Sequence, residues 1–477
     1  MTTGSGAFLG IDLGTSSLKV AVLRDDGTVL AESESGYQVS AVHPGWAETD
    51  PADWWTALTE SVTAISSVLC STRILGIGLA GQMHGVALCD GSGNPLRPAV
   101  LWPDRRADAD LSRWLDLPAT DRARLANPIV PGMYGPALAW LAAHEPSVTD
   151  AAETALLPKD VIRAGLTGSV ATDRTDASAS LLWDVLEDDW ARQVARRTGI
   201  PERLLPDVVP PDTVMGTTSW LAKVIDGGPA DVPVIAGAGD TPAALLAGGG
   251  GVGLQVNLGT GAQVLLPSVV ARAVENPVTH VYGDADGGWY AMAAVQNAGL
   301  AVEWARSLLG LDWKELVAIL DNPAPGQRTI TVLPFLTGER GGLAQPGSRG
   351  AWVGLDQRTT REDLARAALE AMAFTVRRAI ELLPDAATSA ATYIRLTGGG
   401  GREHSVQQLV ANTLGLPVQR VEIRSASATG AAMLAARGVG SVLEPARRQG
   451  PMIDPKVTDG LDEAYRLWLS RIAVADA

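Results

Sequence analysis

Three short segments of the sequence end an apolar run on side chains that can do chemistry. They are "IDLGTSS" with Asp12, "AGQMHGV" with Met83 and His84, and "AGAGDTPAA" with Asp240. Asp240 either caps the helix that follows or acts as a base in a crevice. Asp12 either holds a tight turn or orients Mg²⁺ through water. A carboxylate base and a metal-bound phosphate are what phosphoryl transfer to an alcohol requires.

Glycine-rich turns offer a place for the phosphate. "DLGTSS" (12–17) and "NLGTGA" (257–262) repeat one Gly-Thr turn. Glycine lets backbone N–H groups approach phosphate closely, and the hydroxyls add donors, so two facing hairpins can hold a triphosphate. A third loop, "LTGGGGREH" (396–404), precedes a helix whose N-terminus suits a phosphate or an adenosine group. None of these segments has the spacing of a Walker A loop.

The elements that must position these segments form a repeated pattern. Residues 6–32 predict a strand, a turn and a second strand, and residues 254–266 repeat them. The chain is therefore predicted to hold two similar α/β halves, joined near residues 230–245. Further predicted elements are buried strands over 73–80 and 232–239, helices over 51–70 and 361–383, and a strand, glycine loop and helix over 393–415.

Composition excludes several classes of protein. The 477 residues are too many for one core, so two domains are expected. A net charge of −15 disfavours binding to nucleic acid or to an anionic membrane surface. No apolar run reaches the roughly 18 residues of a membrane span, and the N-terminus lacks a basic signal region. Only two cysteines, Cys70 and Cys89, occur, which indicates a reducing, cytoplasmic location.

Together these segments resemble the FGGY family of carbohydrate kinases over nearly the whole chain. "IDLGTSSLKV" and "NLGTGAQ" are similar to its two phosphate motifs, "GAGDTPAAL" to the segment with its catalytic aspartate, and "LTGGGGREH" to its adenosine motif. "GAWVGLDQRTTREDLARAALE" (350–370) fits the C-terminal signature. The resemblance implies an α/β fold of two ribonuclease-H-like domains, 1–238 and 239–477, as in sugar kinases, actin and heat-shock chaperones, with a ligand cleft between them.

The resemblance also implies an ATP-dependent kinase with Asp240 as catalytic base and Mg²⁺ near Asp12 and Asp240. Glycerol-phosphorylating members carry Arg-Glu where this chain has Met83-His84, whereas xylulose- and sedoheptulose-phosphorylating members carry Met-His. D-xylulose is therefore the expected sugar. The implied sugar-binding residues are Gln82, Met83, His84, Asp104 and Asp240. The implied nucleotide-binding residues are Gly14, Thr15, Ser16, Gly259, Thr260, Gly261, Gly299, Glu303, Gly399, Gly400 and Glu403.

Some positions depart from the pattern and leave alternatives open. Pro103 replaces a usual asparagine, Gly341-Gly342 replaces Thr-Pro, and Glu303 stands where relatives carry a glutamine near the adenosine. The alternatives are a kinase for another ketose or polyol (sedoheptulose, ribulose or L-xylulose), or a non-enzymatic ATP-binding switch. The expected partners are a small ketose and ATP, and a homodimer is a family expectation.

Overall fold

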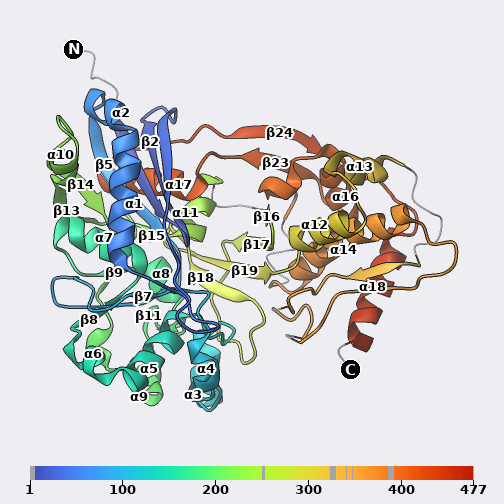
Figure 1. Cartoon of the computed structure of the whole chain (residues 1–477), viewed down its shortest axis with the longest axis horizontal. Coiled ribbons are helices and arrows are strands. Elements are labelled where there is room, and N and C mark those ends of the chain that lie inside the picture. The colour runs from blue at the N-terminus through green and yellow to red at the C-terminus, as the bar shows by residue number, and fades with distance from the viewer. Residues whose placement is uncertain are drawn as a thin grey trace.

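The chain folds into two lobes, each built on a seven-stranded sheet (Figure 1). The computed structural model describes residues 6–249, 253–322, 329–339, 341–345, 347–384 and 391–475. The N-lobe is the part built on the sheet that contains β1. Its strands are β1 (Ala7–Leu13), β2 (Ser17–Arg24), β3 (Val29–Gly36), β5 (Ile74–Gly81), β13 (Val214–Thr218), β14 (Val232–Ile235) and β15 (Ala238–Gly239).

The C-lobe is the part built on the second sheet, which repeats the arrangement of the first. In each sheet the first strand pairs antiparallel with the second and parallel with a later strand: β1 with β2 and β5, β16 with β17 and β22. The predicted repeat and the two-domain α/β fold class are therefore confirmed. The strands of this sheet are β16 (Leu254–Leu258), β17 (Ala262–Pro267), β18 (His280–Gly283), β19 (Trp289–Val295), β22 (Ile394–Thr397), β23 (Val418–Glu422) and β24 (Arg448–Ile453).

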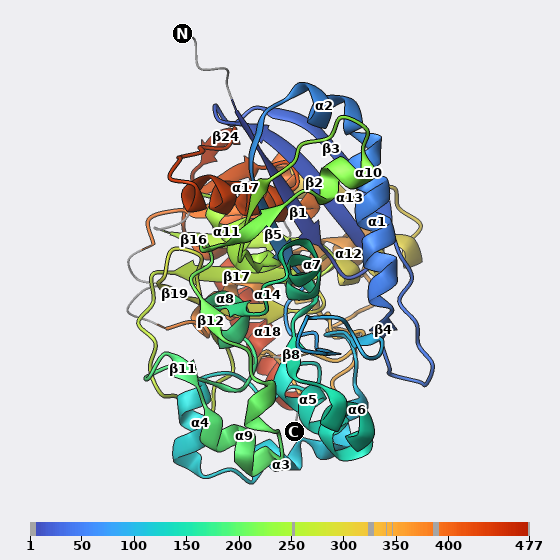
Figure 2. The same cartoon turned by 90° about the vertical axis from the view of Figure 1, so that its left-hand side faces the viewer.

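Helices and short strands complete the N-lobe, and a mainly helical region extends below its sheet (Figure 2). The helices are α1 (Pro51–Ala64), α2 (Ser66–Ser71), α3 (Ser112–Leu115), α4 (Ala119–Leu125), α5 (Tyr134–His144), α6 (Pro146–Ala151), α7 (Pro158–Thr167), α8 (Arg174–Ser178), α9 (Arg192–Thr198) and α10 (Trp220–Val224). The short strands are β4 (Glu48–Thr49), β6 (Ala87–Cys89), β7 (Ala99–Val100), β8 (Thr154–Leu156), β9 (Thr172–Asp173), β10 (Trp183–Asp184), β11 (Asp189–Trp190) and β12 (Val208–Val209).

The C-lobe carries the longest helix among the described residues, α14 (Arg361–Glu381). Its start at Arg361 is fixed by a capping box, because Thr360 and Asp363 each accept a hydrogen bond from the backbone of the other. The other elements of this lobe outside its sheet are α12 (Gly299–Leu308), α13 (Trp313–Ala318), β20 (Thr331–Leu333), β21 (Ala351–Val353), α16 (His404–Leu414) and α18 (Leu461–Ala475).

Two small-residue helices, α11 (Asp240–Ala247) and α17 (Ala426–Gly438), lie between the lobes (Figure 1). Although α17 comes late in the chain, it packs on β1 and β5 of the N-lobe sheet. A methyl group added at Gly10 or Gly78 would overlap its backbone. Glycine at these two strand positions is therefore what lets the helix approach the sheet closely.

Two predicted elements are interrupted. The helix expected over 51–70 is two helices, because the chain leaves helical geometry at Ile65. The strand expected over 232–239 breaks into β14 and β15 at Gly237, whose φ of 89° only glycine adopts easily. This break matters for function, because β15 pairs parallel with β5 and sets the position of Asp240.

Candidate active site

The predicted catalytic segments meet because three neighbouring parallel strands end at the same edge. Leu13 of β1 and Gly239 of β15 are both register partners of Gly81 at the end of β5. Asp12 is the penultimate residue of β1, and Asp240 directly follows β15. The carboxyl ends of strands in α/β sheets are where ligands bind. The structure thus brings the three segments together at one edge.

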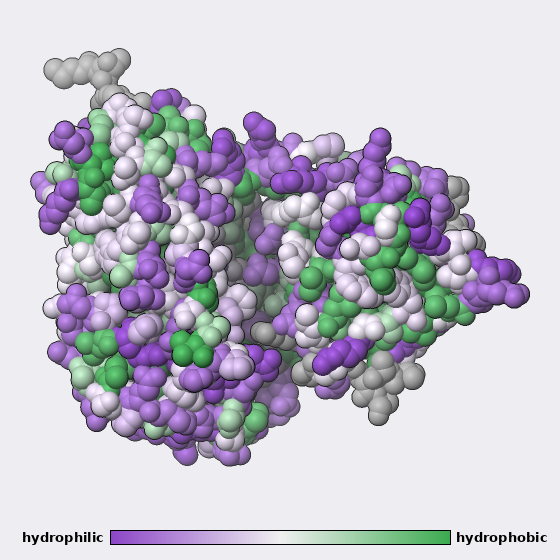
Figure 3. Space-filling view, in the orientation of Figure 1, coloured by the Kyte–Doolittle hydropathy of each residue, from purple (hydrophilic) through white to green (hydrophobic). Residues whose placement is uncertain are grey.

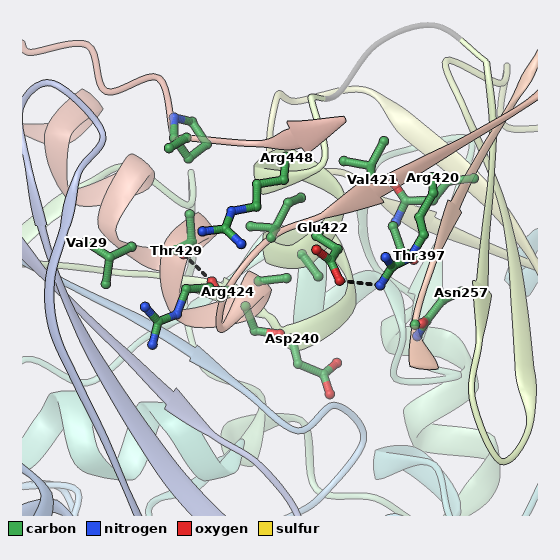
Figure 4. Close-up of a pocket in the computed structure, with 18 of the residues that line it drawn as sticks. Val29, Asp240, Asn257, Thr397, Arg420, Val421, Glu422, Arg424, Thr429 and Arg448 are labelled. Carbon is green, nitrogen blue, oxygen red and sulfur yellow. Dashed lines mark hydrogen bonds and ion pairs between the residues drawn. The ribbon is translucent and has the colours of Figure 1, made fainter. Parts of the chain in front are cut away.

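Asp240 is the first residue of α11 and faces a cavity. The N-cap of that helix is Gly239, and Asp240 Oδ1 accepts a hydrogen bond of 2.6 Å from the Thr241 backbone N–H. Within the described residues, no group donates to its Oδ2. Figure 4 shows Asp240 beside other residues that line the cavity, with its carboxylate pointing away from the labelled arginines. Burial raises the pKa of Asp240, and the Thr241 hydrogen bonds oppose this rise. Such a carboxylate can accept a proton from a bound alcohol.

Asp12 adds a second carboxylate beside Asp240. Its pKa rises to about 7, first because it is desolvated and next because it repels the negative charge of Asp240. Its Oδ1 is buried and has no hydrogen-bond partner within the described residues. A cation would satisfy this oxygen and relieve the repulsion. The described residues contain no group of three or more metal-ligating side chains. Asp12 therefore fits Mg²⁺, which commonly takes one or two carboxylates and completes its shell with phosphate and water.

His84 and Met83 lie at the end of β5, as predicted. The backbone of His84 has φ 72°, a left-handed conformation that is strained for a side chain of this type. Its Nδ1 lies 2.8 Å from the Ala179 carbonyl oxygen, so Nδ1 carries the proton and donates. Burial lowers the pKa of His84 to about 4, which keeps the ring neutral. Nε2 is therefore left as a hydrogen-bond acceptor for a ligand.

Gln82 and Trp102 join this loop to the first glycine hairpin. Gln82 Nε2 donates to the Gly14 carbonyl over 3.2 Å, and Trp102 Nε1 donates to Thr15 Oγ1 over 2.8 Å. Trp102 is 43% exposed, and sequence reasoning did not select it. The hydroxyl of Tyr37 also donates to the Gly14 carbonyl. The predicted sugar side and the predicted phosphate turn are thus one connected unit.

Asp104 does not reach the cavity. It is 2% exposed, and Arg106 donates to both of its carboxylate oxygens. The Ala47 backbone N–H adds a further bond, of 2.6 Å. These bonds account for its acceptors and fix the loop that carries Trp102. Direct contact of Asp104 with a sugar stays a prediction that this geometry does not support.

The second glycine hairpin is closely packed on the start of α12. The Gly259 backbone N–H donates to the Gly261 carbonyl at 2.9 Å, and the Leu300 N–H donates to the Thr260 carbonyl at 2.8 Å. A methyl group at Gly299 would overlap the Gly259 carbonyl, whereas one at Gly259 would meet only the Gly261 carbonyl oxygen at 3.8 Å. Gly259 therefore leaves room for a ligand, and Gly299 is needed for packing.

The third loop forms a short turn ahead of α16. Gly399 has no atom within 4 Å of an added methyl group and lines the cavity, while Gly400 packs on Leu258. Glu403 is the exposed N-cap residue of α16. Glu303 is ion-paired with Arg306 at 2.6 Å, and these hydrogen bonds lower its pKa. Neither glutamate lines the cavity, so their nucleotide contacts stay predictions.

The cavity itself has a volume of about 820 Å³ and lies between the lobes. The space-filling view shows the molecule hollowed there (Figure 3). Asp240, Thr241 and Ala244 of α11 form part of it, and Gly27 and Val29 of the N-lobe close one side. Its C-lobe wall carries polar side chains that sequence reasoning missed, namely Gln255, Asn257, Gln263, Thr397, Arg402, Arg420, Glu422 and Arg448.

Strand alternation could have found part of that wall. Asn257 and Gln263 are register partners on β16 and β17, so their side chains share one face. Polar residues on the inner face of a buried strand signal a ligand. Arg420 and Arg448 come from β23 and β24, whereas Arg402 lies in the third glycine loop, and no local pattern predicts that the three converge. They give an acidic chain a positively charged wall that suits phosphate.

Behind the site lies a fully buried charge network, which sequence reasoning also missed. Lys159 Nζ contacts Asp160, Asp173 and Asp176 at 2.7, 2.6 and 3.0 Å. Asp173 caps α8, and the Thr175 hydroxyl on that helix accepts a 2.9 Å bond from the Gly239 N–H. The network therefore anchors the backbone immediately before Asp240.

Comparison with known proteins places this site in a family. Residues 7–247 match the N-terminal domain, and residues 254–439 the C-terminal domain, of the FGGY family of carbohydrate kinases. The chain therefore belongs to that family. It is a carbohydrate kinase, and sugar kinases of this family use ATP.

Individual relatives agree with this assignment. The xylulose kinase of Escherichia coli K12 is 30% identical over 439 residues, which cover 90% of this chain and 89% of that protein. That of Streptomyces coelicolor is 34% identical over 439 residues, covering 90% and 87%. The crystal structure of xylulose kinase from Rhodospirillum rubrum has a TM-score of 0.90 at 27% identity and covers 98% of both chains. Within the part of this chain that the structure describes, no helix is long and apolar enough to cross a membrane.

Proposed function

We propose that the protein transfers the γ-phosphoryl group of ATP to D-xylulose and forms D-xylulose 5-phosphate. The observation that carries this proposal is the convergence of three strand ends, which places Asp240 beside Met83-His84 and Asp12. The names of relatives that share 30–34% of their residues with this chain support xylulose as the sugar. A Met-His pair, with one neutral acceptor nitrogen, suits a ketose hydroxyl better than a charged arginine would.

In the proposed reaction Asp240 acts as the general base. Its carboxylate removes the proton from the terminal hydroxyl of the sugar while that oxygen attacks the γ-phosphorus. The bond from phosphorus to the β–γ bridging oxygen breaks, and ADP leaves. The raised pKa of Asp240 helps, because a stronger base draws the proton more effectively. His84 Nε2 accepts a hydrogen bond from another sugar hydroxyl, and Met83 forms an apolar wall.

The chain holds ATP through its two glycine hairpins and its third glycine loop. Backbone N–H groups of the two Gly-Thr turns meet the phosphates, other than those of Gly14 and Gly259, which donate to the Ser17 and Gly261 carbonyls. The Thr15 and Thr260 hydroxyls are further donors. Gly399 leaves space for the nucleotide on the C-lobe. Asp12 would hold Mg²⁺, which neutralises phosphate charge when it is bound. The free thiols Cys70 and Cys89 support a cytoplasmic enzyme, and a homodimer stays an expectation.

A sugar panel tests the proposal. ADP release is measured with D-xylulose, sedoheptulose, D-ribulose, L-xylulose and glycerol at saturating MgATP. We expect the highest kcat/KM for D-xylulose. A much faster rate with another sugar would keep the kinase but replace the substrate, and Pro103 and the Gly341-Gly342 turn would be examined first. Both of those glycines have a positive φ, which proline cannot adopt. ATP hydrolysis that responds to no sugar would favour the non-enzymatic switch.

The same panel with His84→Ala tests the sugar side. Loss of one buried hydrogen bond should lower kcat/KM for D-xylulose by roughly 5- to 150-fold, equivalent to about 1–3 kcal/mol. The KM for ATP should stay near that of the parent, because other loops hold the nucleotide. An unaltered ketose response would remove His84 from the proposed site.

A further inference from the structure

Tyr290 on β19 is a buried tyrosine whose hydroxyl has no partner among the described residues. Its side chain is 0% exposed, and its hydroxyl oxygen makes no hydrogen bond within the described residues. Two other buried tyrosines are satisfied. The Tyr282 hydroxyl lies 2.7 Å from His280 Nδ1, and the Tyr134 hydroxyl donates to the Ala155 carbonyl at 2.8 Å. Leaving a buried hydroxyl unpaired is unfavourable, so the Tyr290 hydroxyl needs a partner other than the described residues, as a bound ligand would provide.

The position of Tyr290 indicates what that partner is. It belongs to the same buried cluster as Met83 of the N-lobe and Leu245 of α11. Its register partner Tyr282 lies 5.8 Å from the His84 ring, measured between ring centroids. Burial raises the pKa of Tyr290 first, and the negative charges of Asp240 and Asp176 raise it further. The hydroxyl is therefore protonated and can donate a hydrogen bond.

A second unpaired polar atom lies at the same place. Asp176 is 0% exposed, and its Oδ2 contacts Lys159, but its Oδ1 has no hydrogen bond within the described residues. A methyl group built on Gly239 would lie 3.3 Å from this Oδ1 and 3.1 Å from Met83 Sδ. Oδ1 thus lies beside the methionine and the residue that precedes Asp240. Two buried, unpaired oxygens at the sugar side are typical of a site that awaits a polyhydroxylated ligand.

We propose that Tyr290, carried to the site by the C-lobe, hydrogen-bonds a hydroxyl group of the sugar, with Asp176 Oδ1 as a second contact. The inference rests on the proposed function, since it names a further residue of the same sugar site. Tyr290 then makes the sugar a bridge between the lobes, because Met83 and His84 belong to the N-lobe. A sugar that lacks the matching hydroxyl leaves the tyrosine unpaired and is rejected.

Tyr290→Phe tests the proposal, and Tyr282→Phe is its matched control. Each change removes one buried hydroxyl and keeps the ring. The melting temperature is measured with and without D-xylulose at several concentrations, and the KM for D-xylulose and for ATP is determined. We expect Tyr290→Phe to melt at or above the parent temperature without sugar, because it removes an unpaired hydroxyl. Its sugar-induced shift should shrink, and its KM for D-xylulose should rise roughly 5- to 150-fold. The KM for ATP should not move.

Tyr282→Phe should show the opposite pattern. It should melt lower than the parent without sugar, because it breaks the bond to His280, and it should keep the sugar-induced shift. A Tyr290→Phe protein that melts as low as Tyr282→Phe would overturn the inference, since its hydroxyl would then serve the fold. An unchanged sugar-induced shift would overturn it as well. A parent protein that responds to none of the panel sugars would instead count against the proposed function, which keeps the two failures distinct.

Discussion

At the scale of single residues, His84 has one nitrogen left for a ligand. The sequence predicts a neutral imidazole that meets a pair of sugar hydroxyls, donating at one nitrogen and accepting at the other. The structure commits Nδ1 to the Ala179 carbonyl, so only Nε2 remains, and it accepts. Recognition of a second hydroxyl then falls to other residues, and the unpaired Tyr290 hydroxyl is suitably placed.

Asp240→Asn should abolish most activity without disturbing the fold. Asparagine keeps the shape and can still accept the Thr241 hydrogen bond through its amide oxygen, but it cannot take a proton. Loss of a general base costs about 10²–10⁴-fold in rate. Turnover and binding of both substrates should be measured together. Near-normal turnover would leave Asp240 only a structural role at the start of α11.

Asp12 should make Mg²⁺ binding depend on pH near neutrality. With a pKa of about 7, its carboxyl is protonated below that pH and must lose the proton to bind a cation. The Mg²⁺ affinity of the ATP-loaded protein, measured by calorimetry, should fall about tenfold per pH unit below this value. Asp12→Asn is the control, because it keeps the titration of ATP itself and removes that of Asp12. If the Mg²⁺ affinity depended equally on pH in both proteins, Asp12 would not be the metal ligand.

The same raised pKa affects stability without ligand. The carboxyl has a pKa near 3.8 when exposed and about 7 in the fold, so its contribution to stability is present below pH 4 and is lost as the pH rises to 7. Asp12→Asn should therefore stabilise the ligand-free protein more at pH 8 than at pH 5. Thermal unfolding at the two pH values measures this difference.

At the scale of elements, the glycines of the hairpins and the glycine that begins α12 have different roles. The sequence predicts that Gly14 and Gly259 are needed for close backbone approach or for a positive φ. The structure gives neither residue a positive φ, and the space above Gly259 is open. Glycine is instead required at Gly299, because α12 begins there in close contact with the hairpin and a larger side chain would overlap it.

Gly259→Val and Gly299→Ala should separate these roles. Gly259→Val should keep the parent melting temperature and weaken ATP binding roughly 5- to 150-fold, because the side chain blocks phosphate from the backbone N–H groups. Gly299→Ala should lower the free energy of unfolding by about 1–3 kcal/mol through overpacking. Calorimetry with ATP and sugar separately, and thermal unfolding, check both. Equal losses of ATP and sugar affinity in a folded Gly259→Val protein would contradict the assignment.

At the scale of the whole molecule, the lobes are joined at two places, beside β18 and around α17. Asn127 of the N-lobe exchanges two hydrogen bonds with the backbone of Val281 on β18, at 3.1 and 3.0 Å, and both residues are buried. The Ser178 hydroxyl accepts a third from Gly283, at 2.8 Å. Beside the cavity, the Ala446 backbone N–H donates to the Gly27 carbonyl at 3.4 Å, and Arg424 forms an ion pair with Glu32.

Sugar and nucleotide together should close the lobes. Closure would exclude water from the γ-phosphate and limit wasteful ATP hydrolysis. Small-angle scattering with D-xylulose and a non-hydrolysable ATP analogue should give a smaller radius of gyration than the free protein. An unchanged profile at saturating ligands would leave water exclusion to local loops.

The sequence by itself determined the features that depend on residues close together in the chain. The two hairpins, the strand of residues 74–81 and the loop after it are each encoded by apolar runs that end on glycine and a polar residue, so the site around Asp12, His84 and Asp240 was predictable. The repeat of the first hairpin in the second half also predicted two similar lobes. The division at residues 238/239 stays a prediction.

Only the tertiary structure decided which distant residues complete the site. Tyr290, Arg420 and Arg448 come from three separate strands of the C-lobe, and α17 packs across onto the N-lobe sheet. Such contacts depend on strand register and on how two sheets face each other. Those relations join residues far apart in the chain, so a local sequence pattern does not predict them.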